Sequence, residues 1–292
     1  MATRPHSPSL PQELLEQVLA KLGFQQLPAT SAADLADLYA AWCQKVPFDN
    51  VRKMIHLHSG NSGELPGSQS DDFFKAWLAH GTGGTCWAGA GALHALLSSL
   101  GYDCQRGVAT MLVAPELPPN HATVRVTVGG TNYLMDSSIL CGEPLRLDEE
   151  NETIISHPAW GLTCSQRDGR WHIAWRPLHK TDGFECRIEH FDVEEQDFLT
   201  NHEATRPWSP FNYELTARLN RGDEVIGAAF GHAVTFGSDG TVTRAPISTE
   251  ERNRLLIEGI GLSEEIVSQL PADRPTPPPP GSRAAAAAQA AG

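Results

Sequence analysis

The chain has 292 residues, of which 40% are hydrophobic and 20% charged, and its net charge is −13. This length allows two or three domains, and the acidic excess argues against binding to nucleic acid, which depends on clustered Lys and Arg. The excess leaves room for an anionic ligand such as a nucleotide cofactor, for which Arg106 and Arg125 are candidates for a local basic site.

No apolar run is long enough to span a membrane, and the N-terminus lacks the apolar core of a signal peptide. The six cysteines are widely spaced and form no CxxC pair, which predicts neither a metal site nor a disulfide framework. We therefore expect a reduced, cytoplasmic protein without a membrane partner.

Residues 1–102 are predicted to form a helical domain. The segments "PQELLEQVLAKLGF" and "SAADLADLYAAWCQKV" repeat apolar residues at helical spacing. A polar loop rich in Gly and Ser, at 58–72, precedes a short helix, "FFKAWLAH". The last helix of the domain begins near Cys86 and ends at Gly101, because glycine is the commonest residue after a helix C-terminus.

The period changes from helical to alternating at about residue 103. Residues 103–192 contain successive strand patterns joined by glycine-containing turns, which predicts an antiparallel sheet or barrel. Residues 193–270 mix helical and alternating segments. The Pro- and Ala-rich stretch 271–292 is predicted to be a disordered tail.

Cys86 follows a glycine-rich turn in "HGTGGTCWAGAG" and falls in the first turn of a predicted helix, with Thr85 suited to cap it. The free N–H groups of a first turn stabilise a thiolate, which is the form of cysteine that attacks electrophiles. One of these N–H groups could also donate to an oxyanion. The alternative is a small core residue, since free cysteine is among the most buried residue types.

His121 stands at the head of one predicted strand, and Asp136 stands at the end of the next. A two-residue glycine turn pairs Val128 with Thr131, and it places His121 and Asp136 as diagonal neighbours on one face of the hairpin. A carboxylate bonded to one imidazole nitrogen leaves the other nitrogen for a thiol. The alternative is a surface histidine and an unrelated strand-end carboxylate, and a bulge in the turn would separate the two residues.

The sequence resembles the arylamine N-acetyltransferase family from about residue 30 to 270. "KVPFDN" is similar to the family's "IPFEN" segment, and "GGTC" is similar to its "RGGxC" nucleophile loop. "HATVRVTVGGTNYLMD" follows the family's His-to-Asp hairpin, and "NHEATRPWSPF" follows a later family segment. By position, the resemblance places the family's catalytic triad on Cys86, His121 and Asp136.

The resemblance also implies the fold. It is an α+β architecture with an N-terminal helical bundle over 1–102, an antiparallel β-barrel over 103–192 and an α/β lid over 193–270. A cysteine-protease-like triad forms its core.

Several neighbours of the triad depart from the family pattern. Thr82 stands where the family has arginine before the two glycines. Ala88 and Ala90 replace the Glu and Asn of the family's "CFEQN" segment, and Ser137 begins a different sequence after the aspartate. Losing a charged pair near the nucleophile is either a structural exchange for packing or the mark of a reshaped pocket.

The resemblance implies an N-acyltransferase of the EC 2.3.1 class that forms a cysteine thioester. The donor would be acetyl-CoA or another acyl thioester, used as a co-substrate with no permanently bound cofactor. The acceptor would be an aromatic or other small-molecule amine, and Trp87 is the one tryptophan that we place near its pocket.

Three alternatives remain. An amide synthase of natural-product biosynthesis would take a longer acyl chain from an acyl carrier protein. A hydrolase would pass the acyl group to water. A catalytically silent relative would act as a binding protein.

Overall fold

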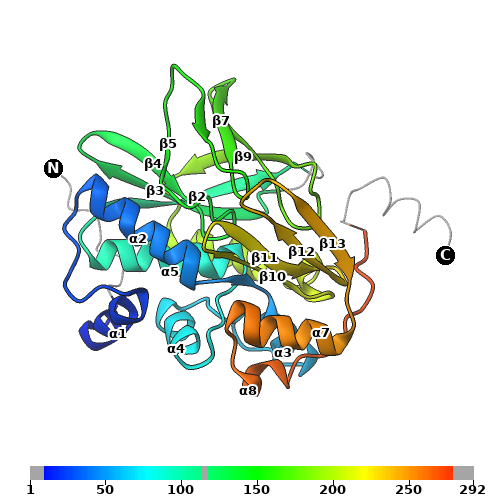
Figure 1. Ribbon diagram of the computed structural model, residues 1–292. Coiled ribbons are helices and arrows are strands. Elements are labelled where there is room, and N and C mark those ends of the chain that lie inside the picture. Colours follow the sequence, from blue (N-terminus) through cyan, green and yellow to red (C-terminus); the bar gives the residue numbers. More distant parts are fainter. Residues whose placement is uncertain (1–9, 113–117, 279–292) are drawn as a thin grey trace.

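The N-terminal helices lie on one side of the molecule, an antiparallel barrel lies on the opposite side, and a second, smaller sheet lies beside both (Figure 1). The structure is a computed structural model, and it describes residues 10–112 and 118–278. The predicted α+β class, with a helical part, a barrel and a mixed C-terminal part, is confirmed. In the described part of the chain, no helix is long and apolar enough to cross a membrane.

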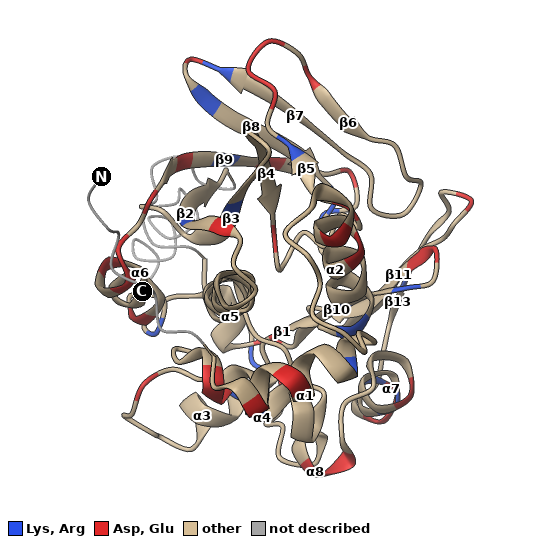
Figure 2. Cartoon of the chain, turned by 90° about the vertical axis from the view of Figure 1, so that its left-hand side faces the viewer, with Lys and Arg blue, Asp and Glu red and all other residues tan. Residues whose placement is uncertain are grey.

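Five helices form the N-terminal part: α1 (Gln12–Leu22), α2 (Ala32–Lys45), α3 (Val51–His58), α4 (Ser70–His80) and α5 (Cys86–Ser99). Ser31 caps α2, because its side chain accepts a hydrogen bond from the Asp34 N–H. Helix α5 is apolar on all sides, contains no Lys, Arg, Asp or Glu, and is mostly buried. Figure 2 shows α5 end-on, between the barrel strands and the other helices. A helix that is apolar all round belongs in a core, and here it carries Cys86 inward.

Eight strands form the barrel: β2 (Asp103–Met111), β3 (His121–Val128), β4 (Thr131–Met135), β5 (Leu145–Arg146), β6 (Thr153–Ile155), β7 (Leu162–Arg167), β8 (Arg170–Trp175) and β9 (Phe184–Phe191). They follow the order β5-β4-β3-β2-β9-β8-β7-β6, and every neighbouring pair is antiparallel. The end strands β5 and β6 contact each other, so the sheet is nearly closed.

The turn between β3 and β4 has the predicted length of two residues. Val128 pairs with Thr131, and the glycines between them have φ values of 57° and 81°. Both values lie in the left-handed region that glycine reaches at little cost, as a type I′ hairpin turn requires. The register predicted for this hairpin is therefore confirmed.

The second sheet has the order β1-β10-β11-β12-β13 and is antiparallel throughout. Its strands are β1 (Phe48–Asp49), β10 (Thr216–Arg221), β11 (Glu224–Ala229), β12 (His232–Phe236) and β13 (Val242–Pro246). The two residues of β1 interrupt a segment predicted to be mainly helical. They pair with β10, which joins the helical part to the C-terminal part.

The C-terminal part also contains α6 (Glu195–Glu203), η1 (Pro210–Asn212), α7 (Thr249–Arg254), the π-helix η2 (Leu255–Ile260) and α8 (Glu264–Val267). Residues 271–278, the start of the predicted tail, follow α8 and contact the segment that leads into β10. The Asp273 carboxylate accepts a hydrogen bond from the Leu215 N–H at 3.0 Å, and the Thr276 hydroxyl donates to Glu214 at 2.5 Å. The rest of the predicted tail, 279–292, lies outside the described residues.

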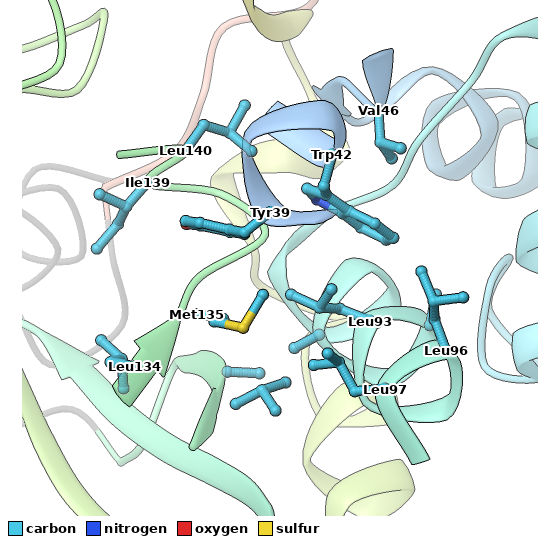
Figure 3. Packing of buried hydrophobic residues seen from close by; sticks show 14 of the residues in the cluster. Tyr39, Trp42, Val46, Leu93, Leu96, Leu97, Leu134, Met135, Ile139 and Leu140 are labelled. Carbon is cyan, nitrogen blue, oxygen red and sulfur yellow. The ribbon is translucent and has the colours of Figure 1, made fainter. Parts of the chain in front are cut away.

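The main core joins the helices to the barrel. Figure 3 shows Tyr39 and Trp42 of α2 on one side of this core, Leu93 of α5 near them, and Met135 at the end of β4. All four are fully buried or nearly so. Burying a side chain of this size contributes roughly 1.5–3 kcal/mol, so this contact fixes how the helices sit against the end of β4.

Asn50 links α3 to the C-terminal part through a buried amide. Its Nδ2 donates to the backbone oxygens of Phe211 and Glu214 at 2.9 and 2.8 Å, and its Oδ1 accepts from the Thr216 N–H at 2.8 Å.

We predict that Asn50→Ala lowers the free energy of unfolding by about 2–4 kcal/mol, because three buried backbone groups lose their partner. Chemical denaturation measures this. Asn151→Ala, in an exposed turn, is the control and should change stability by less than about 0.5 kcal/mol.

Candidate active site

The turn before Cys86 is held against the "VPFDN" segment at very close range. The Gly83 N–H donates to Asp49 Oδ2 at 2.7 Å, and the Asp49 N–H donates to the Gly84 oxygen at 3.2 Å. A Cβ atom on Gly83 would lie 1.8 Å from the Pro47 oxygen, which no side chain can tolerate. Two motifs far apart in the sequence therefore interlock, and glycine is required where they meet.

Cys86 is the first residue of α5, as the glycine turn and the apolar run predict. Thr85 occupies the N-cap position, although its side chain makes no capping hydrogen bond. The N–H groups of a first helical turn have no partner within the helix, so they present positive charge to the Cys86 sulfur. The thiol is buried, and its Sγ lies 3.9 Å from the backbone oxygen of Asn120.

His121 and Asp136 are brought together by the β3–β4 register. His121 Nε2 lies 2.7 Å from Asp136 Oδ2, and both side chains are about 2% exposed. The other carboxylate oxygen of Asp136 accepts from the N–H groups of Ser138 and Ile139, each at 2.9 Å. With Nε2 engaged, His121 has only Nδ1 left to serve Cys86.

Burial and charge act in opposite directions on this pair. Burial by itself lowers the pKa of His121, but the Asp136 carboxylate and a Cys86 thiolate together raise that pKa above its ordinary value. Burial likewise acts to raise the pKa of Asp136, and the His121 imidazolium and two backbone N–H groups outweigh it, so the pKa of Asp136 is lowered. The arrangement therefore favours the charged form of His121 beside an ionised Asp136.

Tyr39 of α2 forms two hydrogen bonds with the backbone of Asp136. Its hydroxyl donates to the Asp136 backbone oxygen at 2.7 Å and accepts from the Asp136 N–H at 3.1 Å. Both backbone groups of Asp136 are thereby satisfied away from water.

Ser137, one of the residues that depart from the family pattern, lies at a tight packing contact between α5 and the chain after Asp136. A Cβ atom on Gly89 would lie 2.6 Å from the Ser137 hydroxyl oxygen, and a Cβ atom on Gly84 would lie 2.8 Å from the Ala88 Cβ. Ala90 and Thr82 are fully buried. The absence of a side chain at Gly89 allows α5 to approach the segment after Asp136 at Ser137.

A cavity of about 150 Å³ opens beside Cys86 and His121. Its aromatic lining comes from all parts of the chain: Phe48, Trp87, Trp175, Phe184, Trp208 and Phe211. Trp87, the predicted pocket tryptophan, is among them, and its ring packs edge-on against Phe198 with centroids 5.2 Å apart. Within the described residues no group of His, Cys, Asp and Glu is arranged to hold a metal ion.

The sequence interpretation missed several cavity residues. The cavity is lined by Trp175, Lys53 and Arg218, and no local pattern distinguishes these residues from surface or core residues of the same type. Trp208 also lines it, and this residue lies in the family-like segment "NHEATRPWSPF". The candidate basic residues are elsewhere and have protein partners. Arg106 lies 3.5 Å from Glu195, and Arg125 donates to Gln105 and lies over the Phe191 ring. Neither arginine lines the cavity beside Cys86.

A cysteine at a helix start, a histidine bonded to a buried carboxylate and an adjoining apolar cavity define a site suited to acyl transfer through a thiol. A model of the N-acetyltransferase family matches residues 31–265. The chain therefore belongs to this family, as the motifs predicted, and it is an acetyltransferase enzyme.

Solved structures with the same fold are arylamine N-acetyltransferases. Those from Salmonella typhimurium and Mycobacterium abscessus are both 16% identical to this chain, with TM-scores of 0.73 and 0.72. The match to the Salmonella structure covers 89% of this chain and 98% of that chain. The match to the Mycobacterium structure covers 88% of this chain and 93% of that chain. One from Bacillus cereus, described as having a Cys-His-Glu catalytic triad, is 18% identical with a TM-score of 0.69, covering 86% and 99%. No curated protein matches the sequence.

The close contact at Gly83 yields a prediction. Gly83→Ala should lower the free energy of unfolding by more than about 3 kcal/mol, because the new methyl group forces the turn before Cys86 away from the Pro47 oxygen. Gly91→Ala is the matched control within α5. An added methyl there meets only a Phe198 ring carbon, at 3.5 Å, and should be neutral or stabilise the protein by up to about 1 kcal/mol. Equal stabilities of the two variants in thermal denaturation would contradict the interlocking of the two motifs.

Proposed function

We propose that Cys86 is the nucleophile of an acyl transfer from a CoA thioester to an amine, with His121 as the general base and acid and Asp136 as the residue that orients it. One observation carries the proposal. Cys86 and His121 both line the apolar cavity, and His121 presents its remaining nitrogen while Asp136 holds the other.

In the first step the Cys86 sulfur attacks the carbonyl carbon of the acyl-CoA. The new S–C bond forms as the bond from carbon to the CoA sulfur breaks, and the His121 imidazolium gives its proton to the departing thiolate. An N–H at the start of α5 can donate to the oxyanion that forms in between. The acyl group then sits on Cys86 as a thioester, and His121 is neutral.

In the second step the amine nitrogen attacks the thioester carbon. His121 Nδ1 accepts the proton that the nitrogen loses, the C–S bond to Cys86 breaks, and the product amide leaves. Cys86 and His121 return to the thiolate–imidazolium pair in which they began. The aromatic lining of the cavity supports an arylamine as acceptor, because flat rings pack well against aromatic side chains.

The choice among the alternatives follows from the same features. The family match and the fold favour transfer to an amine, and they do not favour the carrier-protein amide synthase. All six cysteines are free thiols, which suits the cytoplasmic location that the sequence predicts.

The first test is intact-protein mass spectrometry after brief exposure to acetyl-CoA. We expect one acetyl adduct on the parent protein and none on Cys86→Ala, because the covalent intermediate forms on that sulfur. Adding an arylamine should discharge the adduct and release the amide. An adduct that persists on Cys86→Ala would place the acyl group on another residue and refute the proposed nucleophile.

Asp136→Asn tests the orienting role. The asparagine Oδ1 can still accept from the Ser138 and Ile139 N–H groups, which turns its NH₂ toward His121 Nε2. His121 must then carry its proton on Nδ1, where it cannot act as a base for Cys86. We expect kcat to fall by about 10²- to 10⁴-fold in steady-state amine acetylation. Circular dichroism verifies the fold, and Asp72→Asn at the protein surface is the control; retention of a tenth of the parent rate by a folded Asp136→Asn would contradict the role.

A further inference from the structure

The cavity beside Cys86 has a charge pattern opposite to that of the whole molecule. The chain carries 35 Asp and Glu against 22 Lys and Arg. Among the described residues that line the cavity, one is a lysine, Lys53, one is an arginine, Arg218, and no Asp or Glu is present. A buried cation is costly unless an anion compensates it, so this lining needs an explanation.

Lys53 is the more exceptional of the two cations. It projects from α3, is 5% exposed, and its Nζ donates to the Thr205 hydroxyl at 2.8 Å. That hydroxyl in turn donates to the His202 oxygen at 2.7 Å, so its lone pairs face the ammonium. Within residues 10–112 and 118–278 no carboxylate oxygen lies within ion-pair distance of Nζ. An ammonium has three N–H donors, and Thr205 uses one of them.

The surroundings of Lys53 offer little compensating charge. Burial lowers the pKa of Lys53 to about 7; a Cys86 thiolate and Glu203 act to raise it, and Arg206 acts to lower it. Glu203 is itself bound to the Arg206 guanidinium. Burial and the nearby Lys53 lower the pKa of His202 to about 3, so His202 is neutral.

Arg218 adds a second positive charge to the same cavity. It lies on β10 opposite Phe48, is buried, and donates to the Arg176 oxygen at 3.0 Å. Its guanidinium lies 5.4 Å from the centroid of the Trp175 ring, and its Nε has no partner among the described residues. Burial lowers the pKa of Arg218 to about 10, which still leaves it charged at neutral pH.

We propose that Lys53 forms an anion subsite in this cavity and binds a carboxylate carried by the substrate, with Arg218 adding positive potential. The inference rests on the proposed function, since it concerns what is held beside Cys86 during acyl transfer. The carboxylate can come from either substrate: from the acceptor, as in an aminobenzoate, or from the acyl group, as in the half-thioester of a dicarboxylic acid. Both present the same group to the two free N–H donors of the ammonium.

The subsite gives the reaction a pH dependence of known sign. The charged ammonium binds the carboxylate, and binding in turn favours the charged form. The KM for a carboxylate substrate should therefore stay level below about pH 7, the pKa of Lys53, and rise above it. The KM for the matching neutral substrate should not rise over the same range.

The experiment compares matched pairs of substrates that differ only in charge. The acceptor arm uses 4-aminobenzoate against 4-aminobenzamide with acetyl-CoA, and the donor arm uses succinyl-CoA against butyryl-CoA with aniline. We expect the parent enzyme to prefer the carboxylate member of one arm by at least about tenfold in kcat/KM, mainly through KM. Lys53→Met should reduce that ratio about tenfold. The control Lys75→Met, on the exposed face of α4, should leave it unchanged.

The ratio is informative because any effect of Lys53→Met on folding or on the shared chemistry cancels within a pair. A preference in the acceptor arm assigns the carboxylate to the amine, and a preference in the donor arm assigns it to the acyl group. If the parent enzyme does not prefer the carboxylate substrate in either arm, the proposal is overturned by the parent enzyme alone. A ratio that survives in Lys53→Met also overturns it.

A binding measurement separates this inference from the proposed function. Isothermal titration of the parent protein with benzoate, benzamide and succinate needs no turnover. Tighter binding of benzoate or succinate than of benzamide, lost in Lys53→Met, supports the subsite even if Cys86 forms no acyl adduct. Equal or undetectable binding of all three probes, together with normal acetylation of aniline, refutes the subsite and leaves the acyltransferase intact.

Discussion

His121 and Asp136 are hydrogen-bonded to each other and are both buried. Burying two ionisable side chains has a free-energy cost, and the surrounding residues of the site offset it. A buried carboxylate needs several donors to remain ionised. One carboxylate oxygen of Asp136 is bound by the imidazole, and the other accepts from two backbone N–H groups. The Tyr39 hydroxyl forms hydrogen bonds with the backbone N–H and C=O of Asp136. The β3–β4 hairpin of the barrel carries His121 and Asp136, and α2 carries the Tyr39 that bonds the Asp136 backbone.

Cys86 lies beside this pair because α5 passes through the core. An apolar helix built largely of small residues can lie close to the chain after Asp136, where Gly89 leaves room for Ser137. At the other side, Gly83 lies against Pro47, so the start of α5 is fixed by the helical part and the second sheet together.

The cavity combines this common acyl-transfer geometry with an unusual lining. Aromatic side chains favour a flat acceptor, and the two buried cations favour an anionic group on one substrate. Lys53 and Cys86 also influence each other, since a thiolate at Cys86 raises the pKa of the lysine. A charge on Cys86 and a charge on Lys53 are thus coupled inside one small volume.

The sequence by itself determined the features that depend on local patterns. Two glycines between alternating strands determined the β3–β4 register and therefore the meeting of His121 with Asp136, and a glycine turn before an apolar run determined the helix start at Cys86. Only the tertiary structure decided that Lys53 and Arg218 share a cavity with Cys86, and that the two residues of β1 pair with β10. Periodicity reports which face of an element is buried, whereas the partner across that face is chosen by packing between elements distant in the chain. A buried lysine cannot be recognised from the apolar repeat, because the sequence pattern is the same whether its ammonium faces bulk water or a cavity.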